Sequence, residues 1–488
     1  MGFKIFFMDA SNKVPEVYIE GVPLFPPSIQ PVETAIPVFI GYTEKAMGMD
    51  GRNRKLIPQR ITSLFEYETC FGGAEVEKAI AVTLTEAVDA WGQLQQLTAT
   101  AAFVPPGSSR HNLYYAIQLF YANGGGPCYV ISVGLYSETN FGQRLDVTPF
   151  QDGLQVMATL AEPTLVAFPE GQHIDTAENY YRLQDATLEH CATAGNRFAL
   201  IEVYETGAHI TQTMESFRNG IGNSHLDYGA AYFPNLVTTF QPNYAEADVV
   251  ISHVQIVNGI LSAAAPLDKL RLSDERLKQG PYYVRAKEAI KKLNVVMPPG
   301  AAVAGAITQV DNNRGVWKAP ANVSLNSVKA PALMISDRDQ ELMNVDPQSG
   351  KSVNAIRAFT GKGVLVWGAR TLAGNNNEWH YIPVRRFMSM VVASVRTALM
   401  PFTVEPNEMA TWFKVRVMIE NFLAQQWKQG ALQGAKPEEA FYVKVGLNQT
   451  MTAQDVADGV MIIEIGMAVL RPAEFILLRI NQKMQTTG

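Results

Sequence analysis

The chain has 488 residues, of which 47% are hydrophobic and 18% are charged, and its formal net charge at pH 7 is -6. This length and apolar content are sufficient for two or three packed domains, and the net negative charge argues against general nucleic-acid binding. The charged fraction lies below the usual share of about a quarter, which is typical of a subunit that buries much of itself against other copies.

Three cysteines, Cys70, Cys128 and Cys191, are widely spaced, so they predict packed thiols rather than a disulfide framework or a metal site. The apolar start of the chain lacks a basic segment and meets Asp9 at once, which is unlike a signal peptide. No apolar run reaches the ~18 residues of a membrane span. We therefore expect a protein that is made and folds in a cytoplasm, without direct membrane insertion.

Residues 14–38 are punctuated by prolines, which fix φ and remove a backbone donor, so this segment is neither a helix nor a central strand. Its one strand-like stretch comprises Val17, Tyr18, Ile19 and Glu20. We interpret residues 1–40 as an extended N-terminal linker arm. The arm lies either on its own domain or on a neighbouring subunit.

Strands and helices alternate along the next part of the chain, which predicts a layered α/β arrangement. Expected strands lie at 38–42, 128–133, 164–168, 197–204 and 228–232, and expected helices at 112–120, 177–194 and 284–293, followed by a small-residue helix after Pro298. Residues 75–101 show no clear pattern, and residues 240–280 are interpreted as a surface insertion. The glycines at 124–126 follow a helix and precede a strand, so they predict a turn rather than a phosphate loop.

Towards the C-terminus the pattern predicts a strand at 364–367 and helices at 382–399 and 408–429. Asn407 is the expected N-cap of the second helix, and Gly430 stands where a C′ glycine belongs. Strand-like segments at 460–469 and 475–480 complete the chain. Thr452, Asp455 and Gly459 have the spacing of a short capped helix just before them.

Catalytic signatures are missing from the sequence. Gly350-Lys351-Ser352 has the second half of a phosphate-binding loop, but Val345 occupies the position of its first glycine. His-Glu-x-x-His and Gly-x-Ser-x-Gly motifs do not occur, and the seven histidines are scattered. We therefore expect no cofactor, no metal and no enzymatic activity.

Several separate motifs resemble the C-terminal domain of contractile-tail sheath proteins, a family that includes phage tail sheaths, R-type bacteriocins and contractile injection systems. These motifs are Asn354-Ala-Ile-Arg, Val366-Trp-Gly-Ala-Arg-Thr-Leu, Arg385-Arg386, Glu405-Pro-Asn-Glu, Gly430-Ala-Leu-Gln-Gly, Glu439-Ala-Phe-Tyr-Val and Pro472-Ala-Glu-Phe. Val14-Pro-Glu-Val-Tyr-Ile-Glu resembles the opening signature of the same family.

The resemblance implies a multi-domain α/β (α+β) fold. A sheath core domain would be built from both chain ends, residues 41–100 and 343–458. An outward-facing α/β insertion would span residues 101–342, and residues 459–488 would form C-terminal linker strands.

The same resemblance implies a structural subunit that stacks helically as hexameric rings around an inner tube, either alone or mixed with a sheath paralogue. Baseplate and tail-terminator or cap proteins would be further partners, and the particle would be a phage tail or a phage-tail-like particle, retained or released. Contraction would release the free-energy difference between two packings of one subunit. The alternatives are a subunit of another helical or capsid-like assembly, and a soluble α/β enzyme.

Two sets of residues are predicted to contact partners. The first comprises linker strands that add to a sheet in an adjacent subunit: Val17, Tyr18, Ile19 and Glu20 at one end, and Met461, Ile463, Ile465 and Met467 at the other. The second would face an acidic inner tube: Arg385, Arg386 and Arg396 on the first C-terminal helix, or Lys414, Arg416 and Lys428 on the second. These cations could instead bridge subunits or face solvent.

Overall fold

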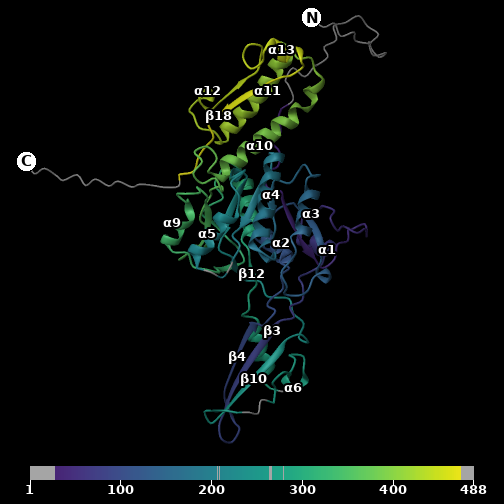
Figure 1. Ribbon diagram of the computed structural model, residues 1–488, viewed down its shortest axis with the longest axis vertical. Helices are drawn as coiled ribbons and strands as arrows, with labels where there is room; N and C mark the ends of the chain where they lie inside the picture. The colour runs from purple at the N-terminus through teal and green to yellow at the C-terminus, as the bar shows by residue number, and fades with distance from the viewer. Residues whose placement is uncertain (1–27, 206, 208, 263–265, 279, 474–488) are drawn as a thin grey trace, which may run out of the picture. The chain divides into compact units, whose positions relative to one another are not determined.

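The computed structural model describes residues 28–205, 207, 209–262, 266–278 and 280–473 (Figure 1). The predicted strands at 17–20 and 475–480 lie outside these residues. The described chain divides into a larger compact unit, residues 31–397, 430–433 and 469–473, and a smaller one, residues 28–30, 398–429 and 434–468. Each unit is described by itself.

The larger unit is organised around a nine-stranded sheet with the order β13-β16-β15-β8-β7-β6-β1-β5-β2. Its strands are β1 (Pro37–Thr43), β2 (Gln59–Ile61), β5 (Cys128–Leu135), β6 (Leu165–Ala167), β7 (Phe198–Glu202), β8 (Gly229–Phe233), β13 (Val323–Ser324), β15 (Val353–Phe359) and β16 (Gly363–Val366). The six strands from β15 to β5 are parallel, and antiparallel strands border them on both sides.

Helices cover both faces of this sheet, as successive side chains on β1 demonstrate: Val38 and Ile40 enter one core cluster, and Phe39 enters the other. The helices of the larger unit are α1 (Leu64–Phe71), α2 (Leu113–Ala122), α3 (Thr148–Met157), α4 (Ala177–Ala194), α5 (Ile210–Gly220), α6 (Glu275–Lys278), α7 (Tyr282–Ile290), α8 (Gly300–Arg314), α9 (Asp337–Asn344) and most of α10 (Ile382–Leu399). Core residues of α3, α4 and α5 share one face, and those of α1, α2 and α8 share the other. The result is a three-layer α/β fold (Figure 1).

A second sheet in the larger unit has its own core and the order β11-β10-β3-β4. Its strands are β3 (Ile80–Val88), β4 (Leu94–Phe103), β10 (Val250–Val257) and β11 (Ile260–Leu261), and its buried face packs on α6 and α7. We call it the four-stranded sheet. A small third sheet joins β9 (Leu236–Thr238), β12 (Val296–Met297) and β14 (Val328–Pro331).

The smaller unit contains a long helix and a two-stranded antiparallel sheet. Its elements are the end of α10, η4 (Met400–Val404), α11 (Met409–Lys428), α12 (Pro437–Ala440), β17 (Phe441–Lys444), α13 (Ala453–Ala457) and β18 (Glu464–Met467). The buried stripe of α11 includes Val415, Ile419 and Phe422, as its spacing predicts.

The multi-domain α/β class is confirmed, but the observed units differ from the predicted division. The nine-stranded sheet takes strands from residues on both sides of the predicted boundaries at 100/101 and 342/343. Residues 80–100, placed with the core by prediction, lie instead in the four-stranded sheet, where β3 pairs with both β10 and β4. Parallel pairing between segments so distant in sequence leaves no local pattern from which the arrangement could be read.

Most helix predictions are confirmed, among them 177–194 and 382–399. The N-cap of α11 is Glu408 rather than Asn407, whose side-chain oxygen accepts instead from the indole of Trp412 at 2.7 Å. The predicted strand at 460–469 shortens to Glu464–Met467.

Candidate assembly surfaces

Arg386 on α10 is anchored inside the larger unit. Its guanidinium forms two bonds with the Asp311 carboxylate, at 2.9 and 2.6 Å, and a third with the carbonyl of Thr34 at 2.7 Å. The side chains of Arg386 and Asp311 are only 4% and 3% exposed. Arg386 is therefore unavailable to an inner tube, and this part of the predicted contact is corrected.

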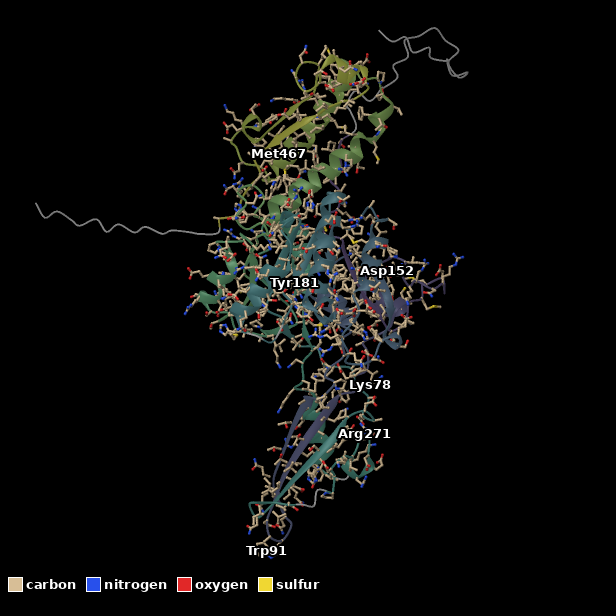
Figure 2. All side chains as sticks on the ribbon, viewed as in Figure 1. Lys78, Trp91, Asp152, Tyr181, Arg271 and Met467 are labelled. Carbon is tan, nitrogen blue, oxygen red and sulfur yellow. The ribbon has the colours of Figure 1, made fainter. Side chains whose placement is uncertain are left out.

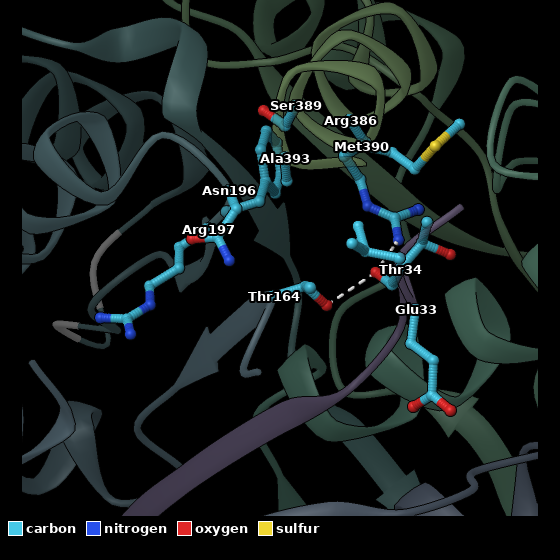
Figure 3. A pocket seen from close by; sticks show the side chains of 11 residues that line it. Glu33, Thr34, Thr164, Asn196, Arg197, Arg386, Ser389, Met390 and Ala393 are labelled. Atoms are coloured by element: carbon cyan, nitrogen blue, oxygen red, sulfur yellow. Dashed lines mark hydrogen bonds between the residues drawn. The ribbon is translucent and has the colours of Figure 1, made fainter. Parts of the chain in front are cut away.

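The same contacts hold residues 32–34, which precede β1, against the larger unit. The hydroxyl of Thr34 donates to Asp311 at 2.6 Å, that of Thr164 donates to the Thr34 carbonyl at 2.7 Å, and the amide of Val32 donates to Ser394 at 3.0 Å. Figure 3 shows Arg386 and Thr164 approaching Thr34 from opposite sides of a cavity of about 20 Å³. This space suits a single water rather than a ligand.

Arg385 is also engaged within its own chain. Its guanidinium lies 4.3 Å from the ring centre of Tyr228 and 4.4 Å from that of Trp379, and it approaches the Asp227 carboxylate at 3.2 Å. The side chain is 11% exposed. Stacking between two aromatic faces explains why an arginine is placed here, and it also removes Arg385 from the predicted tube contact.

The other predicted cations are more accessible. Arg396, Lys414 and Lys428 are exposed. Arg416 is half-buried, lies 3.6 Å from Glu420 and packs over the ring of Phe413. The accessible part of the predicted set therefore comes from the end of α10 and from α11.

Large apolar side chains are also exposed in the smaller unit. Met400 and Val404 on η4 are 66% and 89% exposed, and Met409 and Phe413 on α11 are 77% and 60% exposed. Exposed large apolar groups of this kind mark an interaction surface. The sequence alone does not reveal this feature, because the four residues look like ordinary core positions in a helical pattern.

Segment 382–404 is also long and apolar enough to cross a membrane by length and composition. Its contacts indicate another role, since ten of its residues between Ile382 and Val395 are buried in the fold. Arg386, which pairs with Asp311 of α8, lies within this stretch. We therefore interpret α10 as a packing helix.

The two-stranded sheet of the smaller unit contains half of the second predicted linker segment. Ile465 and Met467 lie in β18 opposite Val443 and Phe441 of β17, while Met461 and Ile463 precede the strand. Burial alternates as predicted over residues 461–464, where Ile462 and Glu464 are exposed, but not over 465–467, where Gly466 is half-buried like Ile465 and Met467. Among the described residues this sheet has only two strands, so both of its outer edges are unpaired there.

A capped helix directs the chain into β18, as predicted. The Thr452 side chain accepts from the amide of Asp455 at 3.2 Å, and the Asp455 carboxylate accepts from the amide of Thr452 at 2.8 Å. Gly459 follows with a φ of 74°, a left-handed conformation that glycine adopts without strain.

The residues considered above for phosphate binding, metal binding or catalysis have structural roles in the fold. The Lys351 ammonium donates to the carbonyls of Arg218 and Ile221, both at 2.6 Å, and Gly124 helps to turn the chain from α2 into β5. Burial raises the pKa of Cys128 and Cys191 to about 12, which keeps both thiols protonated and unreactive. Within the described residues, no group of three His, Cys, Asp or Glu side chains could hold a metal ion.

A buried carboxylate occupies the position where parallel α/β folds commonly bind anionic ligands, the helix N-terminus beyond the carboxyl end of a strand. Glu170 accepts from the amides of Asn112 and Leu113 at the start of α2, at 3.0 and 3.1 Å, and from Tyr42 at the end of β1, at 2.8 Å. Burial raises its pKa to about 7, against the effect of these bonds. The fold thus fills this position with its own side chain.

Comparisons with known proteins agree with this structural character. Residues 375–483 match the phage tail sheath C-terminal domain family. Among curated proteins, none matches this chain significantly.

Solved contractile assemblies match nearly the whole chain. The anti-feeding prophage helical sheath in the contracted state is 27% identical, covering 97% of this chain and 100% of its own, with a TM-score of 0.63. A chain of the anti-feeding prophage baseplate has the same values. The PVC sheath complex, an extracellular contractile injection system in the contracted state, is 26% identical, covering 97% of this chain and 98% of its own, with a TM-score of 0.63. The motifs, the fold and these matches together support a contractile tail sheath family for this chain, and residues 375–483 match that family's C-terminal domain.

Proposed function

We propose that this protein is the structural subunit of a contractile sheath that polymerises helically, as stacked hexameric rings, around an inner tube and contracts to drive that tube through a target envelope. The observation that carries this proposal is the match over 97% of the chain to sheath assemblies in the contracted state. Assembly in a bacterial cytoplasm, baseplate and terminator partners, and a place in a phage-tail-like particle belong to the same proposal.

The β17–β18 sheet is the proposed junction between neighbouring subunits. Because β18 already pairs with β17 of its own chain, the original hypothesis of a donated strand at 460–469 is revised: this sheet receives strands, and Val17–Glu20 of a neighbour adds to it. The two edges left unpaired within the described residues support this arrangement. Main-chain pairing at such an edge provides affinity that does not depend on long side chains.

The inner tube is proposed to meet α11 of the smaller unit. The exposed cations Lys414 and Lys428, with the half-buried Arg416, would provide electrostatic attraction to an acidic tube. Met409 and Phe413, which are exposed on the same helix, would add apolar contact. Arg396 of the larger unit remains a separate candidate.

Sedimentation of the purified chain with and without residues 1–22 tests this function. The full chain is expected to form fast-sedimenting polymer, and the truncated chain to remain a folded, slowly sedimenting subunit with unchanged circular dichroism. Polymer of normal length from the truncated chain would refute the junction. A different helical or capsid-like assembly would appear as particles without a sheath's helical stacking.

A further inference from the structure

An unusually long uncharged stretch forms one border of the four-stranded sheet. Every residue from Ala90 to Ser109 is uncharged, in a chain of which 18% of the residues are charged. Residues 94–103 of this stretch are β4, and we call residues 90–104 the uncharged edge. Trp91 is 87% exposed at the end of this sheet, where Figure 2 shows it far from Lys78 at the opposite end.

The two edges of the four-stranded sheet differ in whether another described part of the chain pairs with them. The border at β10 is covered by its own chain: β11 pairs with it, and residues 269–272 bond to its first half through Lys269, Leu270 and Leu272. β4 pairs with β3 along its full length on one side. On its other side, no described strand pairs with it.

The open face of the sheet beside β4 is uncharged as well. On β4 the residues pointing outward are exposed, among them Thr98 and Thr100, and they stand opposite Thr85 and Thr83 of β3. The only charged residue in β3 or β4 is Glu86, and it points inward, where it accepts from Tyr282 at 2.6 Å.

Exposed edge strands normally carry lysine, proline or a bulge that prevents pairing with another chain. β4 has none of these, and the one irregularity of its pairing with β3 falls at the far end, between Ala87 and Val88. An edge strand that lacks lysine, proline and a bulge over ten residues indicates an interaction site rather than a solvent-exposed border.

The size of the surface indicates which partner it serves. Three strands at about 4.8 Å spacing and ten residues at about 3.3 Å per residue give a face of roughly 500 Å². A stable two-protein interface buries about 800 Å² on each partner. The uncharged edge, even together with the three-stranded face beside it, is thus too small to hold a free dimer, but it is suitable as one of several contacts within a polymer.

We infer that the uncharged edge is a lateral contact with a second copy of this chain in the assembled sheath. This inference rests on the proposed function, since it requires a polymer. In a polar helical polymer, each contact joins two different surfaces of neighbouring subunits. The β4 strand of one subunit therefore meets a different surface of its neighbour rather than the neighbour's β4. The contact then forms only on assembly, and this surface alone does not cause the free subunit to dimerise.

Hydrogen exchange of the full chain, free and polymerised, tests the contact directly. The amides of β4 that face away from β3 are expected to exchange at least tenfold more slowly in the polymer than in the free subunit. Polymer in which these amides exchange as fast as in the free subunit would overturn the contact and leave the proposed function standing. A chain that never polymerises would instead overturn the proposed function, and this contact with it.

A pair of variants at the same positions provides the second arm. Thr98→Lys with Thr100→Lys introduces two charges on the edge without touching the buried face, and it should raise the concentration needed for polymerisation at least tenfold. Thr98→Ser with Thr100→Ser keeps the edge uncharged and should polymerise like the parent. Near-ultraviolet circular dichroism confirms that both are folded. Equal polymerisation of the lysine pair and the parent would contradict the inference.

Discussion

Arg386 and Asp311 form a buried ion pair with two hydrogen bonds, and the same arginine holds the carbonyl of Thr34. The pair therefore joins α10, α8 and the residues just before β1 at one point. Two residues 75 positions apart in sequence thus hold Thr34 in place.

Removing Arg386 should strongly destabilise the larger unit. Arg386→Ala leaves the Asp311 charge buried and unpaired, which typically costs about 3–5 kcal/mol of unfolding free energy. Urea unfolding of the free subunit measures this loss. The exposed pair Arg182–Glu178 is the control, because Arg182→Ala should cost less than about 1 kcal/mol. Similar losses for the two variants would contradict the anchoring role of Arg386.

Glu170 should make stability depend on pH in a defined direction. Its pKa in the fold, about 7, lies above its ordinary value of 4.5, so the folded protein favours the protonated carboxyl. Its stabilising contribution is therefore present below about pH 4.5 and is lost as the pH rises through 7, by roughly 1–3 kcal/mol.

Glu170→Gln, which does not titrate, measures this contribution. Urea midpoints at pH 5 and pH 7.5 are compared for the parent and the variant, so that other titrating groups cancel. The parent should lose more stability over this interval than Glu170→Gln does. An equal pH dependence in the two proteins would show that Glu170 keeps one protonation state throughout.

Proline in β18 should separate folding from assembly. Ile463 precedes the strand, whereas Ile465 lies within it and pairs with Val443, so Ile465 is the informative site. Ile465→Pro removes one backbone donor and costs about 1–3 kcal/mol for each buried carbonyl left unpaired. We expect folded, soluble subunit that forms no sheath in sedimentation. Glu464→Gln, at an exposed neighbouring position, should assemble normally; its failure would indicate a side-chain effect rather than a strand effect.

The joint at Gly459 gives a separate prediction. Insertion of two glycines after Gly459 lengthens the connection between α13 and β18 without changing either element. Such particles should assemble but fail to contract after a denaturant or acid trigger, because a slack joint does not transmit the rotation of one ring to the next. If they contract like the parent, the joint is a passive tether.

Charge reversal tests the proposed tube contact. Lys414→Glu with Lys428→Glu should abolish sheath formation on the tube while allowing polymer without a tube, because both side chains are exposed and neither is needed for the fold. Lys362→Glu, an exposed cation of the larger unit, is the control. Unchanged dependence on the tube in the double variant would exclude this electrostatic contact.

Local patterns predicted the helices well, because each of them buries one stripe of its own sequence; α4 and α10 are found at the predicted residues. The four-stranded sheet was not predicted, since β3 pairs with β10 across more than 160 residues and its outer strand is uncharged rather than alternating apolar and charged. The partners of Arg385 and Arg386 also come from distant segments, so sequence alone could not distinguish a buried ion pair from an exposed binding patch.

Electron microscopy of the purified full-length chain decides whether the protein forms a sheath. We expect hollow helical tubes or stacked six-membered rings, whose wall accommodates one copy of this fold per subunit. A chain that remains monomeric at high concentration, both alone and with its inner tube, would contradict the assignment of a sheath function.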